Sequence, residues 1–220
     1  MSVVAAVHNN AATLPDLCRR IRESVPECEI VLVDDASTDA SRDVIRRLGV
    51  TAITLAARQG QSEAIRQGLA RASGRLCCVL DADLEDPPEA LPLMLERVRR
   101  GDAAVVFSTR DGRRRLTSRL FRTAMRLLYP TLTSRACLCF AARADAAAEI
   151  VKRAAPGDYL VAIIGVLRLR TAQVPVVRSP RPAGSSGYPG LRRTRHGIST
   201  FISAVRLRWT AVHRVRGVTS

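Results

Sequence analysis

The segment Leu80-Asp81-Ala82-Asp83-Leu84-Glu85-Asp86-Pro87-Pro88-Glu89 carries the clearest chemical signal in this sequence. It follows the apolar run Leu76–Leu80, which predicts a buried strand, and it places carboxylates at alternate positions where that strand ends. In an open α/β sheet, ligands collect beyond the carboxyl ends of the strands, and hard oxygen donors there suit Mg²⁺ or Mn²⁺ holding a diphosphate. The alternative is a solvated turn whose acids stabilise the first turn of a helix beginning at Pro87-Pro88.

A second acidic turn follows another predicted strand. The apolar stretch Glu29–Val33 is followed by Asp34-Asp35-Ala36-Ser37-Thr38-Asp39. Thr38 or Asp39 is placed to cap the helix predicted to run through Leu48. Two strands of one parallel sheet that both end in acids predict a single polar crevice.

Strand and helix patterns alternate up to about residue 108. Strands are predicted at Ser2–Val7, Glu29–Val33, Thr51–Leu55, Leu76–Leu80 and Ala103–Phe107, and helices at Leu14–Ser24, Asp39–Leu48, Ser62–Ala72 and Pro88–Arg100. Gly49, Gly74 and Gly101 stand where helix C-caps are expected. The alternation predicts an α/β fold of Rossmann-like type, with a mostly parallel sheet covered by helices on both faces.

The length of the chain fits one domain, or one domain plus a small appendage. A chain of 220 residues can bury one sizeable core, so no second full domain is needed. The longest uninterrupted apolar run is Tyr159–Leu167, shorter than the roughly 20 residues of a spanning helix. No signal peptide is visible before the first strand, so we expect a cytoplasmic protein.

The formal net charge of +15 is unevenly distributed. Residues 1–100 carry 13 Arg against 15 Asp and Glu, whereas residues 101–220 carry 21 Arg and one Lys against 5 acids. The basic half predicts an anionic partner, such as a phosphate, an acidic membrane surface or a nucleic acid. Nucleic acid is not expected, because aromatic residues make up only 4% of the chain and no stacking platform is evident.

Two basic stretches in the second half have amphipathic patterns. The first, residues 113–128, mixes leucines at helical spacing with six arginines, and the second covers residues 191–216. The apolar stripe of the second stretch consists of Ile198, Phe201, Ile202, Val205, Trp209 and Val212. Such helices are typical of membrane surfaces, with Trp209 as an interfacial anchor, although helices packed on the sheet with solvated arginines would show the same pattern.

Six cysteines occur without any Cys-x-x-Cys spacing or neighbouring histidine, which argues against a zinc site. Cys77 and Cys78 lie in the strand that leads to Asp81 and are expected to be small buried side chains. Reduced thiols in a reducing compartment follow.

Four segments in order make the chain resemble family 2 glycosyltransferases of GT-A fold, and most of all the dolichol- or polyprenyl-phosphate sugar transferases. They are Val33-Asp34-Asp35-Ala36-Ser37-Thr38-Asp39, Gly60-Gln61-Ser62-Glu63-Ala64-Ile65-Arg66-Gln67-Gly68, Asp81-Ala82-Asp83-Leu84-Glu85-Asp86-Pro87-Pro88-Glu89 and Arg181-Pro182-Ala183-Gly184-Ser185-Ser186-Gly187-Tyr188. The resemblance implies a GT-A domain over residues 1–190, followed by a basic amphipathic segment over residues 191–220.

The resemblance also implies a set of site residues. Asp34 and Asp35 would contact the nucleotide, while Asp81, Asp83 and Glu85 would hold Mg²⁺ or Mn²⁺. A bridging cation of this kind neutralises the charge that develops on a nucleoside diphosphate leaving group.

The last matching segment supplies the remaining implied residues. Arg181 corresponds to a phosphate-contacting arginine and, with Asp83, is the implied catalytic residue. Ser186 and Tyr188 in the same loop are implied to bind substrate. A generic basic loop is the alternative for Arg181, because many arginines surround it.

Three departures from the family pattern affect the mechanism. The first strand ends in His8-Asn9-Asn10 where relatives usually have Asn-Glu, and His8 is expected to be a satisfied strand-end histidine rather than a base. Cys139 stands where relatives commonly have an acid that is often taken as the catalytic base. Many relatives also continue into transmembrane helices, which this sequence does not contain.

The sequence therefore predicts an inverting, metal-dependent glycosyltransferase that moves a sugar from a UDP- or GDP-sugar to a polyprenyl phosphate. We expect it to lie peripherally on an anionic membrane surface, at the inner face of the cell membrane. One alternative is a transferase acting on a hydroxyl of a saccharide or small natural product, with Asp111 or Asp158 as the base. Another is a degenerate, non-catalytic binding module.

Overall fold

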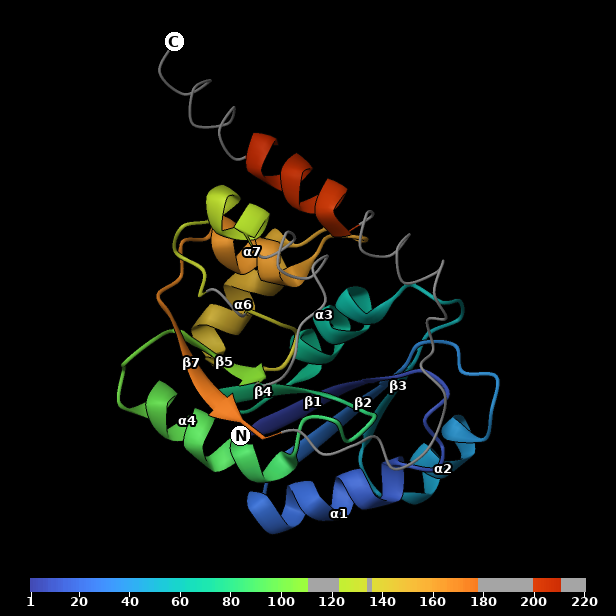
Figure 1. Cartoon of the computed structure of the whole chain (residues 1–220). Coiled ribbons are helices and arrows are strands. Elements are labelled where there is room, and N and C mark those ends of the chain that lie inside the picture. Colours follow the sequence, from blue (N-terminus) through green and yellow to red (C-terminus); the bar gives the residue numbers. More distant parts are fainter. Residues whose placement is uncertain (111–122, 134–135, 178–199, 211–220) are drawn as a thin grey trace.

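The computed structural model describes residues 1–110, 123–133, 136–177 and 200–210. Its described strands form one sheet of seven, in the order β3-β2-β1-β4-β6-β5-β7 (Figure 1). The strands are β1 (Ser2–Val7), β2 (Glu29–Asp34), β3 (Thr51–Thr54), β4 (Leu76–Asp81), β5 (Val105–Arg110), β6 (Phe140–Arg143) and β7 (Thr171–Val176). Only β6 runs antiparallel to its neighbours, β4 and β5, so the predicted mostly parallel sheet is confirmed.

Helices cover both faces of the sheet, as predicted. They are α1 (Leu14–Ser24), α2 (Ser41–Arg47), α3 (Gln61–Arg71), α4 (Leu91–Arg99), α6 (Ala144–Arg153) and α7 (Leu160–Val166). Figure 1 shows α1, α2 and α4 on one face and α3, α6 and α7 on the other. Successive strand residues point to opposite layers, so Val4 and Val79 join the core under α3, while Val3 and Leu80 join the core under α1.

Several element boundaries differ from the predictions. The strand predicted at Ala103–Phe107 lies at Val105–Arg110, and the helix predicted at Pro88–Arg100 begins as a 3₁₀ turn at Pro88–Ala90 before α4. The helix predicted at Asp39–Leu48 is shorter, covering Ser41–Arg47. Consecutive prolines and polar turn residues at these ends leave the hydrophobic period undefined, which makes boundaries hard to place.

Gly49 and Gly101 follow helices with φ of 61° and 76°, which confirms the expected left-handed helix ends. Gly74 was expected to play the same part, but its φ is not positive and α3 ends at Arg71. A Cβ at residue 74 would lie 2.4 Å from the Cα of Met1, so the absence of a side chain allows close backbone approach.

Residues 200–210 form a helix that packs on the main domain. The hydroxyl of Tyr129 donates a 2.6 Å hydrogen bond to the backbone carbonyl of Ala204, and Ala204 and Leu207 are buried in the α3-side core. The ring of Tyr129 lies against Gly165, where an added Cβ would come within 2.7 Å of it. This C-terminal helix is therefore part of the domain's core, although the predicted boundary at residue 190 falls outside the described residues.

Asp158 also attaches the C-terminal helix to the main domain. Its carboxylate accepts hydrogen bonds from Arg206 at 2.7 Å and from the backbone N–H of Ala155 at 2.9 Å, and the residue is buried. Because the Asp158 carboxylate is buried and holds the C-terminal helix, it does not act as the general base that the sequence analysis considered for this residue. Within the ranges described here, no helix has both the length and the apolar character that crossing a bilayer requires.

Candidate active site

Two acidic turns flank the carboxyl end of β1. In the sheet register Ala6 pairs with Asp81 on one side, and Val7 pairs with Asp34 on the other. β1 lies at the point where the strand order reverses, because the chain passes from β1 to β2 and β3 on one side and returns to β4 on the other. This is the place where open α/β sheets bind ligands.

The first acidic turn is buried rather than exposed to a ligand. Asp34 and Asp35 are 1% and 3% exposed. The carboxylate of Asp34 accepts hydrogen bonds from the backbone N–H of Ser37 at 3.1 Å and from Arg42 at 3.2 Å. Asp34 therefore shapes its own turn, and direct contact of its carboxylate with a nucleotide stays a prediction.

Asn9 holds the later part of the first acidic turn, at Ser37 and Thr38, in place. Its side-chain oxygen accepts the backbone N–H of Thr38 at 2.8 Å, and its own backbone N–H donates to the hydroxyl of Ser37 at 3.0 Å. The prediction that Thr38 or Asp39 caps the next helix is wrong, because the N-cap residue of α2 is Ala40; Asp39 instead accepts the backbone N–H of Ser41 at 2.9 Å. Asn9 thus has a structural role that the sequence pattern did not reveal.

His8 is half-buried, and its Nδ1 lies 2.9 Å from the backbone carbonyl oxygen of Asp35. This contact agrees with the prediction of a satisfied strand-end histidine. The neighbouring Asn10 side chain accepts the backbone N–H of His8 at 3.2 Å. Both polar side chains thus stabilise the loop after β1.

The second acidic turn presents its carboxylates differently. Along residues 81–86 exposure alternates, so that Asp81, Asp83 and Glu85 are half-exposed while Ala82, Leu84 and Asp86 are buried. This alternation directs the three predicted metal ligands away from the core.

The backbone of this turn is held in an unusual conformation. Leu84 has φ of 61°, a left-handed value that is costly for a residue with a Cβ, and its side chain is buried. The hydroxyl of Thr13, at the start of α1, donates a 2.7 Å hydrogen bond to the carbonyl of Ala82. Strained turns of this kind persist only where their surroundings hold them, and they concentrate at functional sites.

The segment before α3 links the two acidic turns. The carboxylate of Asp35 accepts the backbone N–H groups of Gln59 at 2.6 Å and Gly60 at 2.9 Å. The next residue, Gln61, donates its side-chain amide to the carboxylate of Asp81 at 2.6 Å. Gln61 was not among the predicted site residues, and only its place in a family-like segment hinted at it.

The remainder of the segment that contains Gln61 is structural. Glu63 is buried and paired with Arg66 at 2.6 Å, and this hydrogen bond holds the pKa of the Glu63 carboxyl below its usual value. Gly68 faces Val4, whose Cγ1 would lie 2.3 Å from an added Cβ. These residues dock α3 closely against β1, and the docking places Gln61 at the site.

The acidic turn fits a cation that is shared with a ligand. In the described ranges no three His, Cys, Asp or Glu side chains converge into a complete metal site. Mg²⁺ is usually bound through one or two carboxylates together with substrate phosphates, so a preformed cage is not required. The half-exposed Asp81 and Asp83 meet that smaller requirement.

Cys139 is buried beside the acidic turn, at 2% exposure. Burial, and next the charge of Asp86, raise the pKa of its thiol well above the usual value. A thiol in this environment stays neutral at physiological pH and does not accept a proton from a substrate hydroxyl. Arg181, Ser186, Tyr188 and Asp111, the other predicted site residues, lie outside the described residues.

The sequence matches the family model described as Glycosyl transferase family 2 over residues 2–151. The match covers both acidic turns and more than half of the chain. The chain belongs to glycosyltransferase family 2. The family resemblance inferred from its four segments is thereby confirmed.

Curated relatives of this family 2 glycosyltransferase include undecaprenyl-phosphate 4-deoxy-4-formamido-L-arabinose transferases. The protein of this name from Pseudomonas paraeruginosa (strain DSM 24068 / PA7) is 32% identical over 208 residues, which cover 87% of this chain and 61% of the relative. That from Salmonella choleraesuis (strain SC-B67) is 29% identical over 211 residues, covering 87% of this chain and 63% of the relative. The chain thus spans about three fifths of the length of these relatives.

Solved structures confirm the GT-A fold. Glucosyl-3-phosphoglycerate synthase from Mycobacterium tuberculosis, in complex with phosphoglyceric acid, superposes with a TM-score of 0.76 at 22% identity, covering 94% of this chain and 79% of that one. The same enzyme with Mn²⁺, UDP and glucosyl-3-phosphoglycerate gives a TM-score of 0.73 at 22% identity, covering 92% and 78%.

Proposed function

We propose that this family 2 glycosyltransferase transfers a sugar from a nucleotide-sugar donor, a UDP- or GDP-sugar, to a polyprenyl phosphate. The observation that carries the proposal is the half-exposed pair Asp81 and Asp83 beside β1, with Asp81 oriented by Gln61. The names of the 32% identical relatives support the lipid phosphate acceptor. The Mn²⁺ and UDP complex of the structural neighbour supports a metal-bound nucleotide.

The chain's own residues would position the donor. Asp81 and Asp83, with Glu85 two residues on, would hold the divalent cation, which when bound neutralises the diphosphate of the leaving group. Gln61 fixes one carboxylate of this set before the donor arrives, so less conformational entropy is lost on binding. The turn containing Asp34 and Asp35 would form the wall against which the nucleoside lies, and Arg181 would contact a phosphate.

The acceptor would supply an oxygen that is already anionic. A phosphate needs no general base to become a nucleophile, whereas a sugar hydroxyl does. The neutral Cys139 at the family's acidic position is compatible with a phosphate acceptor and unfavourable for a hydroxyl acceptor. The acceptor oxygen would attack the anomeric carbon in line with the departing diphosphate and invert its configuration.

The C-terminal helix would hold the enzyme on the membrane that contains this acceptor. Its outward face carries Ile202, Val205 and Trp209, which are 61%, 41% and 67% exposed. Leu127, 78% exposed, belongs to residues 123–128, the described part of the first basic stretch. Apolar side chains in a strongly basic half suit the inner, anionic face of a cell membrane.

A donor screen that measures released nucleotide, with and without polyprenyl phosphate, tests the proposal. We expect release that requires Mn²⁺ or Mg²⁺ and the lipid phosphate, and that is lost in Asp83→Ala. The exposed Asp43→Ala, on α2, is the matched control and should keep full activity. Release only with a saccharide acceptor would contradict the proposed acceptor, and absence of metal-dependent nucleotide binding would contradict a catalytic role altogether.

A further inference from the structure

The second acidic turn, residues 81–86, is attached to α1 on both of its sides. Near its start, the carbonyl oxygen of Ala82 accepts the 2.7 Å hydrogen bond from the hydroxyl of Thr13, the N-cap residue of α1. Shortly after its end, the carboxylate of Glu89 accepts two hydrogen bonds from Arg20 of α1, from Nε at 2.8 Å and from Nη2 at 2.7 Å. Arg20 and Glu89 are 69 residues apart in the chain, so their ion pair joins two separate elements.

The ion pair between Arg20 and Glu89 has a favourable geometry. Both carboxylate oxygens of Glu89 are engaged, in the fork that gives arginine–carboxylate pairs their strength and fixed orientation. The Arg20 side chain is only 19% exposed, and its Nη1 also lies 3.8 Å from Asp16, one turn earlier in α1. Most exposed ion pairs contribute little to stability, but a bidentate pair with one partly buried member is an exception.

The chain between Glu89 and the acidic turn is stiff. Pro87 and Pro88 connect Glu89 to Asp86, and a proline ring fixes its own φ near roughly −65°. Pro87 has φ of −71°, and both Pro88 and Asp86 are buried. A displacement of Glu89 therefore moves the acidic turn, because no flexible linker lies between them to absorb it.

The middle of the turn packs against the same helix. Leu84 belongs to the buried core that also contains Leu14 and Leu17 of α1, and its left-handed backbone conformation needs such support. The carboxylate of Asp83 accepts the backbone N–H of Glu85 at 3.0 Å. The directions of the Asp83 and Glu85 side chains therefore depend on how α1 holds this turn.

We propose that Arg20 is a positioning residue for the cation site: with Glu89 it fixes the end of the acidic turn and thereby sets the affinity for the metal-bound nucleotide. The inference rests on the proposed function, which supplies the cation and the nucleotide. Among the described residues, the ion pairs of Arg20 are with Glu89 and Asp16 alone, so it acts through Glu89. Loss of a direct partner of a metal ligand typically costs about 10–100-fold in metal affinity, and for the more remote Arg20 we expect about three- to tenfold.

Calorimetric titration of UDP at a fixed Mn²⁺ concentration tests the positioning role. Arg20→Ala should weaken binding by about three- to tenfold, and Arg20→Lys, which keeps the charge but not the fork, should recover part of the loss. Glu89→Gln should show a similar loss, and the double variant should bind no more weakly than Arg20→Ala, because the two residues act as one unit. Additive losses, or wild-type binding by Arg20→Ala, would overturn the proposal.

Arg19→Ala is the control within α1. Arg19 is 58% exposed, and its ion-pair partners Asp16 and Glu23 lie in the same helix. The variant removes the same charge from the same helix without removing the attachment to Glu89, so we expect UDP binding equal to that of wild type. A loss as large as that in Arg20→Ala would mean that the charge of α1, and not the attachment, controls affinity.

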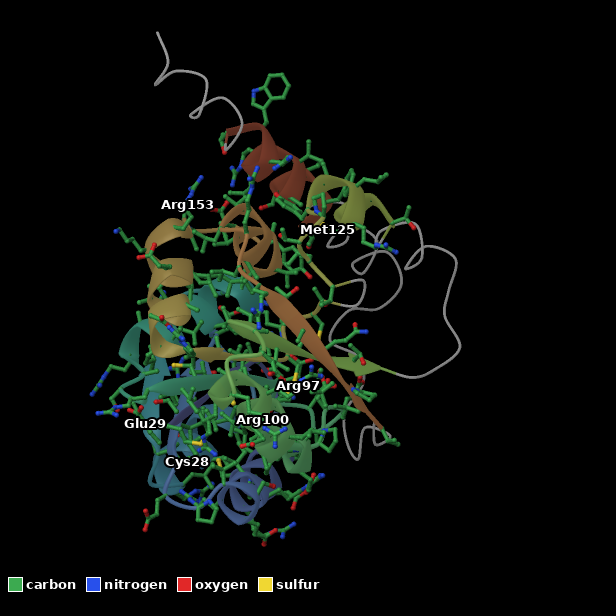
Figure 2. All side chains as sticks on the ribbon, turned by 90° about the vertical axis from the view of Figure 1, so that its left-hand side faces the viewer. Cys28, Glu29, Arg97, Arg100, Met125 and Arg153 are labelled. Atoms are coloured by element: carbon green, nitrogen blue, oxygen red, sulfur yellow. The ribbon has the colours of Figure 1, made fainter. Side chains whose placement is uncertain are left out.

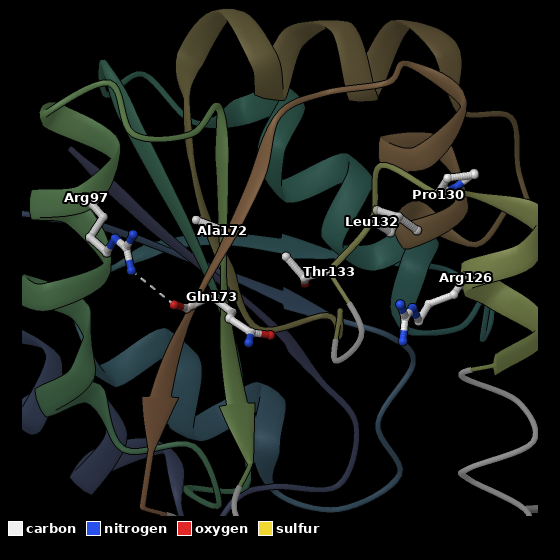
Figure 3. Close-up of a pocket in the computed structure, with 7 residues that line it drawn as sticks. All are labelled: Arg97, Arg126, Pro130, Leu132, Thr133, Ala172 and Gln173. Carbon is white, nitrogen blue, oxygen red and sulfur yellow. Dashed lines mark hydrogen bonds between the residues drawn. The ribbon is translucent and has the colours of Figure 1, made fainter.

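Arg97→Ala is the control for an arginine that joins two elements elsewhere. Its Nη1 donates to the carbonyl of Gln173 in β7 at 3.3 Å, beside a cavity at the β7 edge of the sheet (Figure 3). Figure 2 shows Arg97 and Arg100 at the C-terminal end of α4, the end farther from Glu89. This variant should bind UDP like wild type, and a loss equal to that in Arg20→Ala would contradict a specific role for the pair with Glu89.

Hydrogen–deuterium exchange tests the attachment without any ligand. Arg20→Ala should accelerate exchange of the amides of residues 82–86, while β1 and α3 keep their wild-type rates. Unchanged exchange at residues 82–86 would overturn the proposal, as would acceleration throughout the chain, which indicates general destabilisation. Absence of Mn²⁺-dependent UDP binding in wild type would contradict the proposed function, and the exchange result would still decide whether Arg20 holds the turn.

Discussion

The side-chain amide of Gln61 donates a 2.6 Å hydrogen bond to the carboxylate of Asp81. The bond ties the first residue of α3 to the last residue of β4. Since Asp35 holds the two backbone N–H groups immediately before Gln61, one continuous chain of contacts joins both acidic turns.

Gln61→Ala should weaken Mn²⁺-dependent UDP binding by about tenfold, because Asp81 must then be ordered by the ligand itself. Gln61→Glu should weaken it further, since a second carboxylate beside Asp81 repels the first and competes for the cation. Calorimetry with and without Mn²⁺ measures both. Gln59→Ala is the control, because its exposed side chain is removed while its backbone N–H to Asp35 is kept; a loss equal to that in Gln61→Ala would refute the positioning role.

Glu63→Gln should lower the free energy of unfolding at pH 7 by about 1–3 kcal/mol, because it leaves the partly buried Arg66 without its charged partner. The pKa of Glu63 is lowered in the folded state, so its contribution is present above its unfolded pKa of about 4.3 and is lost as pH falls through the folded value. Urea unfolding between pH 7 and pH 3 should therefore show the difference shrinking with acid. Asp43→Asn, which breaks the exposed pair with Arg46, should change stability little at any pH.

Gly68→Ala should destabilise the fold by about 1–3 kcal/mol, because the added Cβ overlaps Val4. The combination with Val4→Ala should recover part of the loss by making room. Thermal melts of both variants test this close approach of α3 to β1, and additive destabilisation in the double variant would show that the contact is not the cause.

Cys139→Asp should destabilise the protein by several kcal/mol, on the order of 3, because it places a carboxylate at a buried position already facing Asp86 and Asp81. Its pKa would be raised, so the loss should grow as pH rises through the unfolded pKa of about 3.9 toward the folded value. Urea unfolding across this range measures it, with Cys139→Ala as the size control. A stable, pH-independent Cys139→Asp variant would mean that the position is open to solvent and suited to a base.

Trp209→Ala should reduce binding to anionic vesicles by roughly tenfold, corresponding to about 1.5 kcal/mol of lost apolar burial. Binding of wild type should fall as salt rises, because attraction to the leaflet is screened beyond about 8 Å at physiological ionic strength. Leu93→Ala on α4, also exposed at 54%, is the control on another face. Equal losses for both variants in co-sedimentation would show that the C-terminal helix has no special role.

The first half of the fold was predictable because β1, β2 and β4 are buried on both faces and their sequences are continuous apolar runs separated by helices. β6 and β7 were missed. The Phe140–Arg143 segment is short and alanine-rich, and Pro175 argues against a strand, although proline is tolerated in β7 because that strand forms the sheet edge.

The site was only partly predictable for a different reason. Sequence shows that Asp34, Asp35, Asp81 and Asp83 follow strands, but it does not show which carboxylates backbone N–H groups will claim. In the structure the Asp35 carboxylate accepts the backbone N–H groups of Gln59 and Gly60. The Asp83 carboxylate accepts the backbone N–H of Glu85 at 3.0 Å, yet Asp83 stays half-exposed, as does Asp81. The role of Gln61 could not be predicted from a sequence pattern, because its contact with Asp81 depends on how closely α3 approaches β1.

The joint between Tyr129 and Ala204 has an evolutionary consequence. Tyr129 donates its hydrogen bond to a backbone carbonyl, which every amino acid possesses, and this contact therefore does not depend on which side chains the C-terminal helix turns outward. Ile202, Val205 and Trp209 can therefore diverge without loosening the helix from the domain. Substitutions on this face can thus change what the helix contacts without disturbing the sheet beneath it.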